Sequence, residues 1–347
     1  MLHCDRKSMG RIIEYSSRLS GDQTKLSLHS ANIANLLRES NYVARQANSN
    51  MIRIGHVEEA LKNQEMRVSR LRDNVMETFV NGTTLIRTEG KAIGQVNALS
   101  VLSTSDYMFG APNRITATTC YGDGDVIDIE RSVDLGGSIH SKGVMILSAY
   151  LSSVFGKTAR VPLTTTITFE QSYGGVDGDS ASMAELCAVV SAFSKQPNRQ
   201  DIAITGSMNQ FGEAQPIGGV NEKIEGFYDV CVIKGRHEGQ GVIIPQSNVH
   251  NLMLRSDIVK AVEKGEFNIY DRVGANISSD RSYYKSPQIN AQPNDPLYSG
   301  LNYISPGGYA QSNYSGFSMY NDLIGNFHHD LSSNFGMNIN LGHNVTI

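Results

Sequence analysis

The stretch GGVDGDSAS, residues 174–182, is a glycine-rich turn that follows a β-like run and opens a segment with the apolar periodicity of a helix. Ser180 lies at the expected start of that helix, where free backbone N–H groups and the helix dipole can hold the oxyanion of an acyl-transfer intermediate. The small residues beside Ser180 would let the carbonyl group of a peptide approach its hydroxyl closely. The alternative is an ordinary helix cap, because Ser and Asp are the commonest cap residues. The stretch therefore predicts a strand–turn–helix unit with one candidate nucleophile.

A serine nucleophile needs a base, and the two histidines nearest in the sequence, His140 and His237, lie in no recognisable triad context. A lysine can replace histidine if burial lowers its pKa towards neutrality, because desolvation disfavours the ammonium form. The candidate is Lys223 in QPIGGVNEK, residues 215–223, where a proline and two glycines bend the chain before another helix. Taken alone, Lys223 would be a surface lysine, and it becomes a candidate base only in combination with Ser180.

Both segments resemble the proteolytic domain of the Lon protease family (peptidase S16), which uses a Ser–Lys dyad, and in particular its LonB-like branch. DGDSAS, residues 177–182, is similar to the nucleophile motif of the family. AITGSMNQFGEAQPIGGVNEK, residues 203–223, is similar to its lysine motif, and the two motifs lie at a similar separation. Three further segments also resemble LonB-like sequences: GKAIGQVNALSV (90–101), FGAPNRITAT (109–118) and DLGGSIHSKGVMILSAYL (134–151). The resemblance covers residues 80–273.

The resemblance implies roles for four residues. It makes Ser180 the nucleophile and Lys223 the general base, which takes the serine proton and later returns it to the leaving amine. Thr205 matches a threonine whose hydroxyl helps to orient the lysine, although it could be an ordinary strand residue. Asp177 matches an acidic position that could tune the lysine or gate the site, and a structural aspartate of a tight turn is the alternative.

The resemblance also implies an α+β fold of the ribosomal protein S5 domain 2-like kind for residues 80–273, and a hexameric ring whose active sites face an internal chamber. The residue pattern independently favours a mixed α and β domain, because short β-like runs alternate with helical segments there. We expect strands near residues 126–129, 164–169, 202–205 and 242–244, and helices near residues 141–155, 180–195, 220–230 and 256–265.

The regions on either side differ from this domain. Residues 1–79 show helical periodicity and resemble the small lid subdomain of an AAA+ ATPase, so we expect a small helical bundle. Residues 274–347 are rich in Asn, Ser, Tyr and Gly, and no Lys or Arg follows Lys285. Such a composition cannot bury enough apolar surface to fold alone, so we expect a flexible tail, although its tyrosines could stack on a partner.

Composition excludes several other classes of protein. The 347 residues carry a formal net charge of −4 and no run of Lys and Arg, which makes nucleic acid an improbable partner. No apolar run of about 18 residues and no signal-peptide core occur, so we expect a cytoplasmic protein without membrane contact. We expect no metal, because His328 and His329 lack spaced partners and the scattered cysteines form no zinc pattern: Cys4, Cys120, Cys187 and Cys231.

A nucleotide-binding P-loop is also missing from the sequence. Gly156-Lys157-Thr158 supplies the last three letters of the pattern, but Leu151 stands where its first glycine belongs. We therefore expect no cofactor, since ATP would need a partner chain or an N-terminal segment that is absent here.

These observations predict a serine endopeptidase of the Lon type that cleaves unfolded or damaged proteins in cytoplasmic quality control, in a form without its own ATPase P-loop. We expect a homo-oligomer, a hexamer by resemblance, and a separate ATPase chain is a possible partner. The alternative is a non-catalytic binding or assembly module that retains the Lon fold. A reactive-serine probe would separate the two, because labelling demands an activated nucleophile.

Overall fold

The computed structural model describes residues 1–104, 107–155 and 163–271, together with the backbone of residues 273–286, 289–290, 304–305, 308–332 and 335–346. The chain divides into two compact units, Met1–Arg272 and Val273–Ile347. The first unit carries every candidate site residue, and each unit is described by itself below.

The first unit opens with four helices, as expected for residues 1–79: α1 (Arg6–Ser20), α2 (Ser30–Gln46), α3 (Ile54–Val68) and α4 (Arg70–Val80). The Asp5 side chain caps α1 by accepting a hydrogen bond from the Ser8 N–H, and Gly21 ends that helix in the left-handed conformation. Helices α1 to α3 share a small core that includes Ile12, Leu36 and Val57. Helix α4 packs instead through Met76 and Phe79 against α8 of the following domain.

A seven-stranded mixed sheet forms the centre of the following domain, in the order β11-β10-β7-β2-β3-β5-β4. Strand β3 is antiparallel to both of its neighbours, and all other neighbours are parallel. The strands are β2 (Gln95–Ser103), β3 (Met108–Tyr121), β4 (Val126–Asp128), β5 (Leu163–Phe169), β7 (Ile202–Ile204), β10 (Gly241–Ile243) and β11 (Asn268–Tyr270). Two short antiparallel pairs accompany it: β1 (Lys91–Ala92) with β6 (Asn198–Arg199), and β8 (Ser207–Met208) with β9 (Ala214–Gln215).

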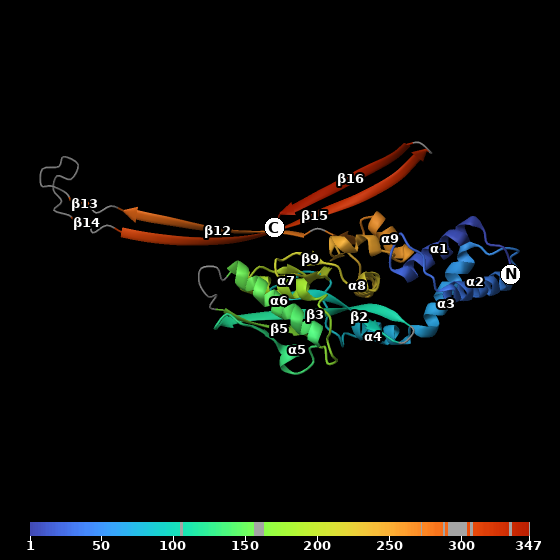
Figure 1. The fold of residues 1–347 in the computed structure, drawn as a ribbon, viewed down its shortest axis with the longest axis horizontal. Coiled ribbons are helices and arrows are strands. Elements are labelled where there is room, and N and C mark those ends of the chain that lie inside the picture. Colours follow the sequence, from blue (N-terminus) through green and yellow to red (C-terminus); the bar gives the residue numbers. More distant parts are fainter. Residues whose placement is uncertain are drawn as a thin grey trace. The chain divides into compact units, whose positions relative to one another are not determined.

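Helices cover both faces of this sheet (Figure 1). Ala98 and Ile204 pack in one core with α6 and α7, whereas the adjacent residues Leu99 and Ala203 pack in a second core with α8 and α9. The helices are α5 (Ile129–Ser132), α6 (Ser138–Phe155), α7 (Ser182–Ser194), α8 (Val220–Lys234) and α9 (Ser256–Glu263), with a 3-10 turn η1 at Gln246–Asn251. The α+β class is confirmed.

Two helices extend beyond their expected bounds for tertiary reasons. Helix α6 begins three residues before the expected position, because the Asp177 side chain accepts hydrogen bonds from the N–H groups of Ile139 and His140. Helix α8 continues beyond residue 230 to Lys234, and Cys231 on this added turn is buried in the core with α9. In both cases, the residues that lengthen the helix contact a segment that is distant in the sequence.

The second unit consists of paired strands: β12 (Val273–Ser286), β13 (Ile289–Asn290), β14 (Ile304–Ser305), β15 (Gly308–Ser332) and β16 (Phe335–Thr346). Strand β15 pairs antiparallel with β12 and β16, and β13 pairs with β14. Paired strands do not report on motion, so the flexibility expected of residues 274–347 stays a prediction.

In the part of the chain that is described, no helix combines the length and the hydropathy needed to cross a bilayer.

Helix α8 lies directly on β3 because two glycines meet there. A Cβ atom added to Gly226 would lie 2.1 Å from the carbonyl oxygen of Gly110. A Cβ atom added to Gly110 would lie 2.0 Å from the carbonyl oxygen of Glu222 and 2.7 Å from the Cα atom of Lys223. The two backbones are therefore in contact one turn from the candidate base, and any side chain at either position would push α8 away from the sheet.

The first prediction compares two alanine substitutions in helix interiors. Gly10 in α1 has no atom within 4 Å of an added Cβ, so Gly10→Ala should stabilise the protein by about 1 kcal/mol through helix propensity. Gly226→Ala should instead destabilise it by about 1–3 kcal/mol, because the methyl group overpacks the contact with β3. Urea unfolding measures both. Equal stabilisation by the two substitutions would contradict the close contact.

Candidate active site

Ser180 lies in the turn that precedes α7, and the turn is tied to the end of β7. The Ser180 carbonyl accepts hydrogen bonds from the Gly206 N–H at 2.8 Å and from Thr205 Oγ1 at 3.2 Å. The residue is half-buried, so its hydroxyl group lies at the edge of the core. The backbone of Ser180 is thus held firmly by a neighbouring strand end.

Lys223 lies in the first turn of α8 and is 3% exposed. Gly219 begins this helix with φ 65°, and a Cβ atom there would lie 2.5 Å from Val101 Cγ2, so the bend needs glycine for two reasons. The bend directs the lysine inward: its Nζ atom lies 2.8 Å from Ser180 Oγ and 3.1 Å from Thr205 Oγ1. The structure therefore brings three of the four expected site residues together.

Burial lowers the pKa of Lys223 to about 8 from its ordinary value of 10.5, because the ammonium form loses hydration. The Asp179 carboxylate acts in the opposite direction, since it stabilises the ammonium form. Asp179 Oδ2 accepts a hydrogen bond from Ser207 Oγ at 2.7 Å. Asp179 was not among the expected site residues, although its position beside Ser180 in the DGDSAS motif is a signal that could have found it.

The Asp177 side chain contacts the start of α6, whereas a residue that tunes the lysine would lie beside Lys223. Its Oδ1 atom accepts from the N–H groups of Ile139 at 3.2 Å and His140 at 3.3 Å. Hydrogen bonds from the backbone of Gly178, His140 and Ile139 lower the pKa of its carboxyl group. The contacts of Asp177 are those of a structural cap on α6, and the carboxylate that acts on Lys223 is that of Asp179.

The N-terminus of α7 is only partly available to a ligand. The Ser182 N–H donates to the Asp179 carbonyl and the Met183 N–H donates to the Gly206 carbonyl, both at 3.1 Å. No hydrogen-bond acceptor in the described part of the chain takes the N–H groups of Ser180 and Ala181. These two groups, rather than those of the first helical turn, are the candidate donors to an oxyanion.

A second buried polar group surrounds His140, for which the sequence indicated no partners. His140 Nε2 lies 3.1 Å from Asp128 Oδ2, and Nδ1 lies 3.6 Å from Glu185 Oε1. Burial raises the pKa of Glu185 to about 7. Burial by itself would lower the pKa of His140, but the Asp128, Glu185 and Glu130 carboxylates outweigh it and the pKa is raised. These partners lie far apart in the sequence, so spacing could not reveal them.

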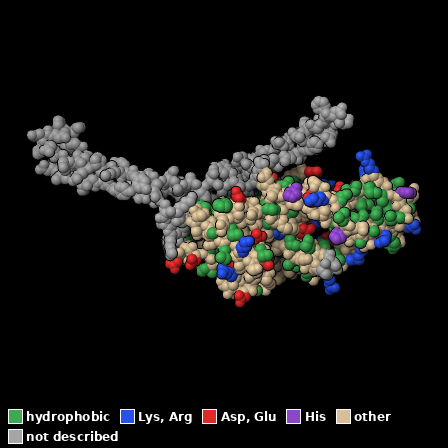
Figure 2. Space-filling model, viewed as in Figure 1, with side chains coloured by type: hydrophobic (Ala, Val, Ile, Leu, Met, Phe, Trp, Pro, Cys, Tyr) green, Lys and Arg blue, Asp and Glu red, His purple; other side chains and the backbone are tan. Residues whose placement is uncertain are grey.

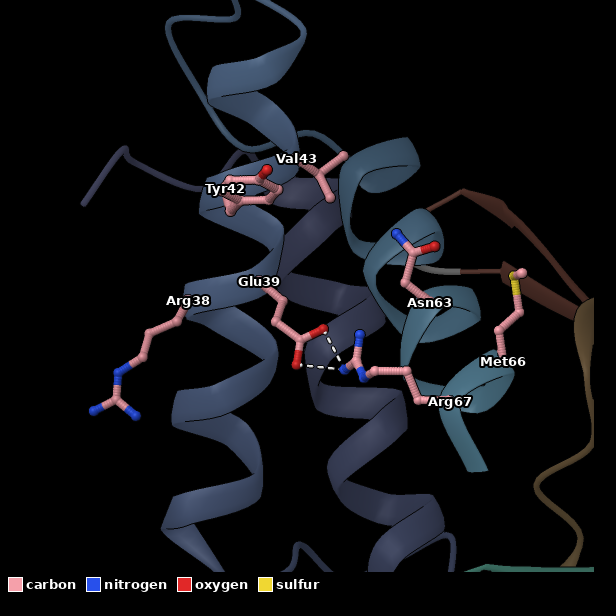
Figure 3. Close-up of a pocket in the computed structure, with 7 residues that line it drawn as sticks. All are labelled: Arg38, Glu39, Tyr42, Val43, Asn63, Met66 and Arg67. Atoms are coloured by element: carbon pink, nitrogen blue, oxygen red, sulfur yellow. Dashed lines mark hydrogen bonds and ion pairs between the residues drawn. The ribbon is translucent and has the colours of Figure 1, made fainter. Parts of the chain in front are cut away.

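A surface pocket occurs in the N-terminal helices, away from the residues discussed above. Side chains of α2 and α3 line it, among them Tyr42 and Met66, and Glu39 forms an ion pair with Arg67 at 2.8 Å across it (Figure 3). None of the candidate catalytic residues lines this pocket. It therefore adds nothing to the chemistry of Ser180.

Comparison with known proteins gives two matches to family models. Residues 3–67 match the archaeal LonB AAA+ ATPase lid domain. Residues 172–274 match the C-terminal proteolytic domain of Lon protease (S16), and this segment contains Ser180, Thr205 and Lys223.

Curated relatives carry the same family name. The chain is 45% identical over 261 residues to a putative Lon protease homolog of Escherichia coli, a match that covers 75% of this chain and 44% of the relative. It is 45% identical over 202 residues to the corresponding protein of Haemophilus influenzae, covering 58% of this chain and 34% of the relative. It is 30% identical over 256 residues to the archaeal Lon protease of Archaeoglobus fulgidus, covering 74% of this chain and 39% of the relative.

The matched region thus spans less than half the length of each of these relatives. The domain match and the Lon-named relatives support a protease role. The chain therefore carries a proteolytic domain of the Lon protease (S16) type, matched over residues 172–274, and a lid domain of the archaeal LonB type, matched over residues 3–67.

Proposed function

We propose that the domain is a serine endopeptidase in which Ser180 is the nucleophile and Lys223 the general base. One observation carries the proposal: the Nζ atom of a lysine that is 3% exposed lies 2.8 Å from the Ser180 hydroxyl oxygen. A buried lysine with a pKa lowered to about 8 has a neutral fraction of roughly one tenth at pH 7, which is enough to act as a base.

In the proposed reaction, neutral Lys223 accepts the Ser180 proton while the hydroxyl oxygen attacks the carbonyl carbon of a peptide bond. The N–H groups of Ser180 and Ala181 stabilise the oxyanion of the tetrahedral intermediate. Lys223 then gives its proton to the leaving amine, and an acyl-enzyme ester forms at Ser180. Neutral Lys223 next activates the water that hydrolyses this ester. Thr205 positions the base, because its hydroxyl accepts from Nζ and donates to the Ser180 carbonyl.

Unfolded or damaged polypeptides are the proposed substrates, in cytoplasmic protein quality control. The active form is proposed to be a homohexamer that obtains unfolded chains from an ATPase module, carried either by a longer form of this chain or by a partner. Apolar side chains exposed on α1 to α3, among them Ile13, Tyr42 and Met66, favour a further protein contact at this end (Figure 2). The chemistry at Ser180 needs no cofactor.

A fluorophosphonate probe tests the nucleophile and its base without a natural substrate. Ser180→Ala should abolish labelling, and Lys223→Met should slow it by about 10²- to 10⁴-fold, because the base is removed while the bulk is kept. Lys234→Met, an exposed position on the same helix, is the control and should label at the wild-type rate. Equal labelling rates in the wild type and Lys223→Met would reject the dyad and favour the non-catalytic binding module.

The pKa of Lys223 predicts how the labelling rate depends on pH. The reactive form is the neutral amine, so the rate should rise about tenfold per pH unit below pH 8 and level off above it. A lysine with its ordinary pKa of 10.5 would instead give a rate that still rises beyond pH 9. Labelling rates measured from pH 6 to 10 on protein that stays folded distinguish these profiles, and a flat profile would count against a titrating base.

Thr205→Val should slow labelling by roughly 10- to 100-fold, because Lys223 loses a hydrogen-bond partner that fixes its position. Thr205→Ser keeps the hydroxyl group and should retain most of the rate. The matched control is Thr165→Val, since Thr165 is also buried in the sheet but its Oγ1 atom has no partner among the described residues. If Thr205→Val labelled as fast as the control, Thr205 would have no positioning role.

A further inference from the structure

The group around His140 buries more negative charge than its one imidazole can balance. Asp128 at the end of β4, Glu130 in α5, His140 in α6 and Glu185 in α7 are 5%, 3%, 2% and 1% exposed. Burying several carboxylates together is costly unless cations or donors compensate them. A protonated His140 would neutralise one of the three carboxylates. The group therefore calls for a further positive charge or a proton.

The orientation of the carboxylates indicates where that charge belongs. Asp128 Oδ1 accepts from the Glu130 N–H at 3.1 Å, and Glu130 Oε1 accepts from Thr168 Oγ1 at 2.9 Å and from the Phe169 N–H at 2.8 Å. The other oxygens, Asp128 Oδ2 and Glu130 Oε2, are buried and have no hydrogen-bond partner in the described part of the chain. Each carboxylate is thus held by one oxygen and offers the other, as the ligands of a metal ion do.

His140 shows the same arrangement. Its Nε2 atom lies 3.1 Å from Asp128 Oδ2, yet the geometry does not satisfy a hydrogen bond, and the atom counts as buried without a partner among the described residues. Ligand atoms of Asp128, Glu130 and His140 all lie within 4.8 Å of one another. Two carboxylate oxygens and one imidazole nitrogen are a donor set for a divalent transition metal rather than for Mg²⁺ or Ca²⁺, which prefer oxygen alone.

The opposite side of the His140 ring supports this assignment. Its Nδ1 atom faces Glu185 Oε1 at 3.6 Å, and Phe169 packs edge-on against the ring with centroids 5.5 Å apart. At this distance the contact is electrostatic rather than a hydrogen bond, and a carboxylate beside the second nitrogen favours the tautomer that carries its proton there, which leaves Nε2 as the ligand atom. Glu185 therefore has the place of a positioning residue outside the set of direct ligands.

We propose that Asp128, Glu130 and His140 bind one divalent transition-metal ion, with Zn²⁺ as the best fit, and that Glu185 positions His140. The ion would connect β4, α5 and α6 and, through Glu185, would hold α7, the helix that begins two residues after Ser180. Its role would be structural, and it is independent of the proposed peptidase chemistry. This proposal differs from the expectation from the sequence that no metal is bound, and the experiments below decide between the two.

Metal retention by the whole chain tests the proposal. Chelator-treated protein is incubated with ZnCl₂, desalted and analysed by elemental mass spectrometry. Wild type should retain one zinc per chain. Asp128→Asn and His140→Gln should weaken binding by more than about 100-fold, and Glu185→Gln by about 10- to 100-fold, as expected for an outer partner. The matched control Asp123→Asn removes an exposed carboxylate from the neighbouring loop and should retain the zinc.

The double variant His328→Ala and His329→Ala tests for zinc binding by these two residues and should also retain the zinc. No zinc on folded wild-type protein, or equal zinc on wild type, Asp128→Asn and His140→Gln, would overturn the proposal.

Thermal unfolding provides a second readout that does not depend on peptidase activity. Zinc should raise the Tm of the chelator-treated wild type and of Asp123→Asn, because a ligand that binds only the folded state stabilises it. The Tm of Asp128→Asn should not respond. If that variant fails to fold, the wild-type titration decides alone. A rise in Tm with MgCl₂ and none with ZnCl₂ would refute a transition-metal site.

Discussion

The burial of one lysine amine is the constraint on which the candidate site depends. An ammonium group loses most of its hydration at this position, so the pKa of Lys223 falls to about 8. A lysine exposed to solvent would keep its hydration and stay protonated at neutral pH, so it could not act as a base. Helix α8 packs on the sheet through the contact of Gly226 with Gly110 and through the buried side chain of Phe227. This packing keeps the Lys223 amine out of water.

The nucleophile is held by a reciprocal pair of backbone hydrogen bonds. The Gly206 N–H donates to the Ser180 carbonyl at 2.8 Å, and the Gly206 carbonyl accepts from the Met183 N–H at 3.1 Å. A Cβ atom at Gly206 would lie 2.1 Å from Met183 Sδ, so glycine lets the strand end approach the start of α7. Since Thr205 precedes Gly206, the same approach brings its hydroxyl between the Ser180 carbonyl and the lysine amine.

Local sequence predicted the features that two continuous motifs encode. The helix starts after Ser180 and before Lys223 follow from glycine-rich turns and apolar periodicity, and the α+β class follows from the alternation of short segments. The sequence left two roles open for Asp177, because two acidic residues flank Gly178, and only the fold shows that Asp177 contacts the start of α6 while the carboxylate of Asp179 acts on the lysine. The partners of His140 were missed because Asp128 and Glu185 come from separate elements, whose meeting depends on the packing of α6 and α7.

The helical N-terminal region contacts the element that carries the base. Arg18 in α1 forms a bidentate ion pair with Glu225 in α8, in which Nη2 lies 2.7 Å from Oε2. Arg18 also donates a hydrogen bond to the Met253 carbonyl at 2.9 Å. Glu225 follows Lys223 by two residues and is 9% exposed, so its charge needs a partner. The ion pair therefore joins α1 to the part of α8 that carries Lys223. Within one turn of the base, α8 thus contacts β3 through Gly226 and α1 through Glu225.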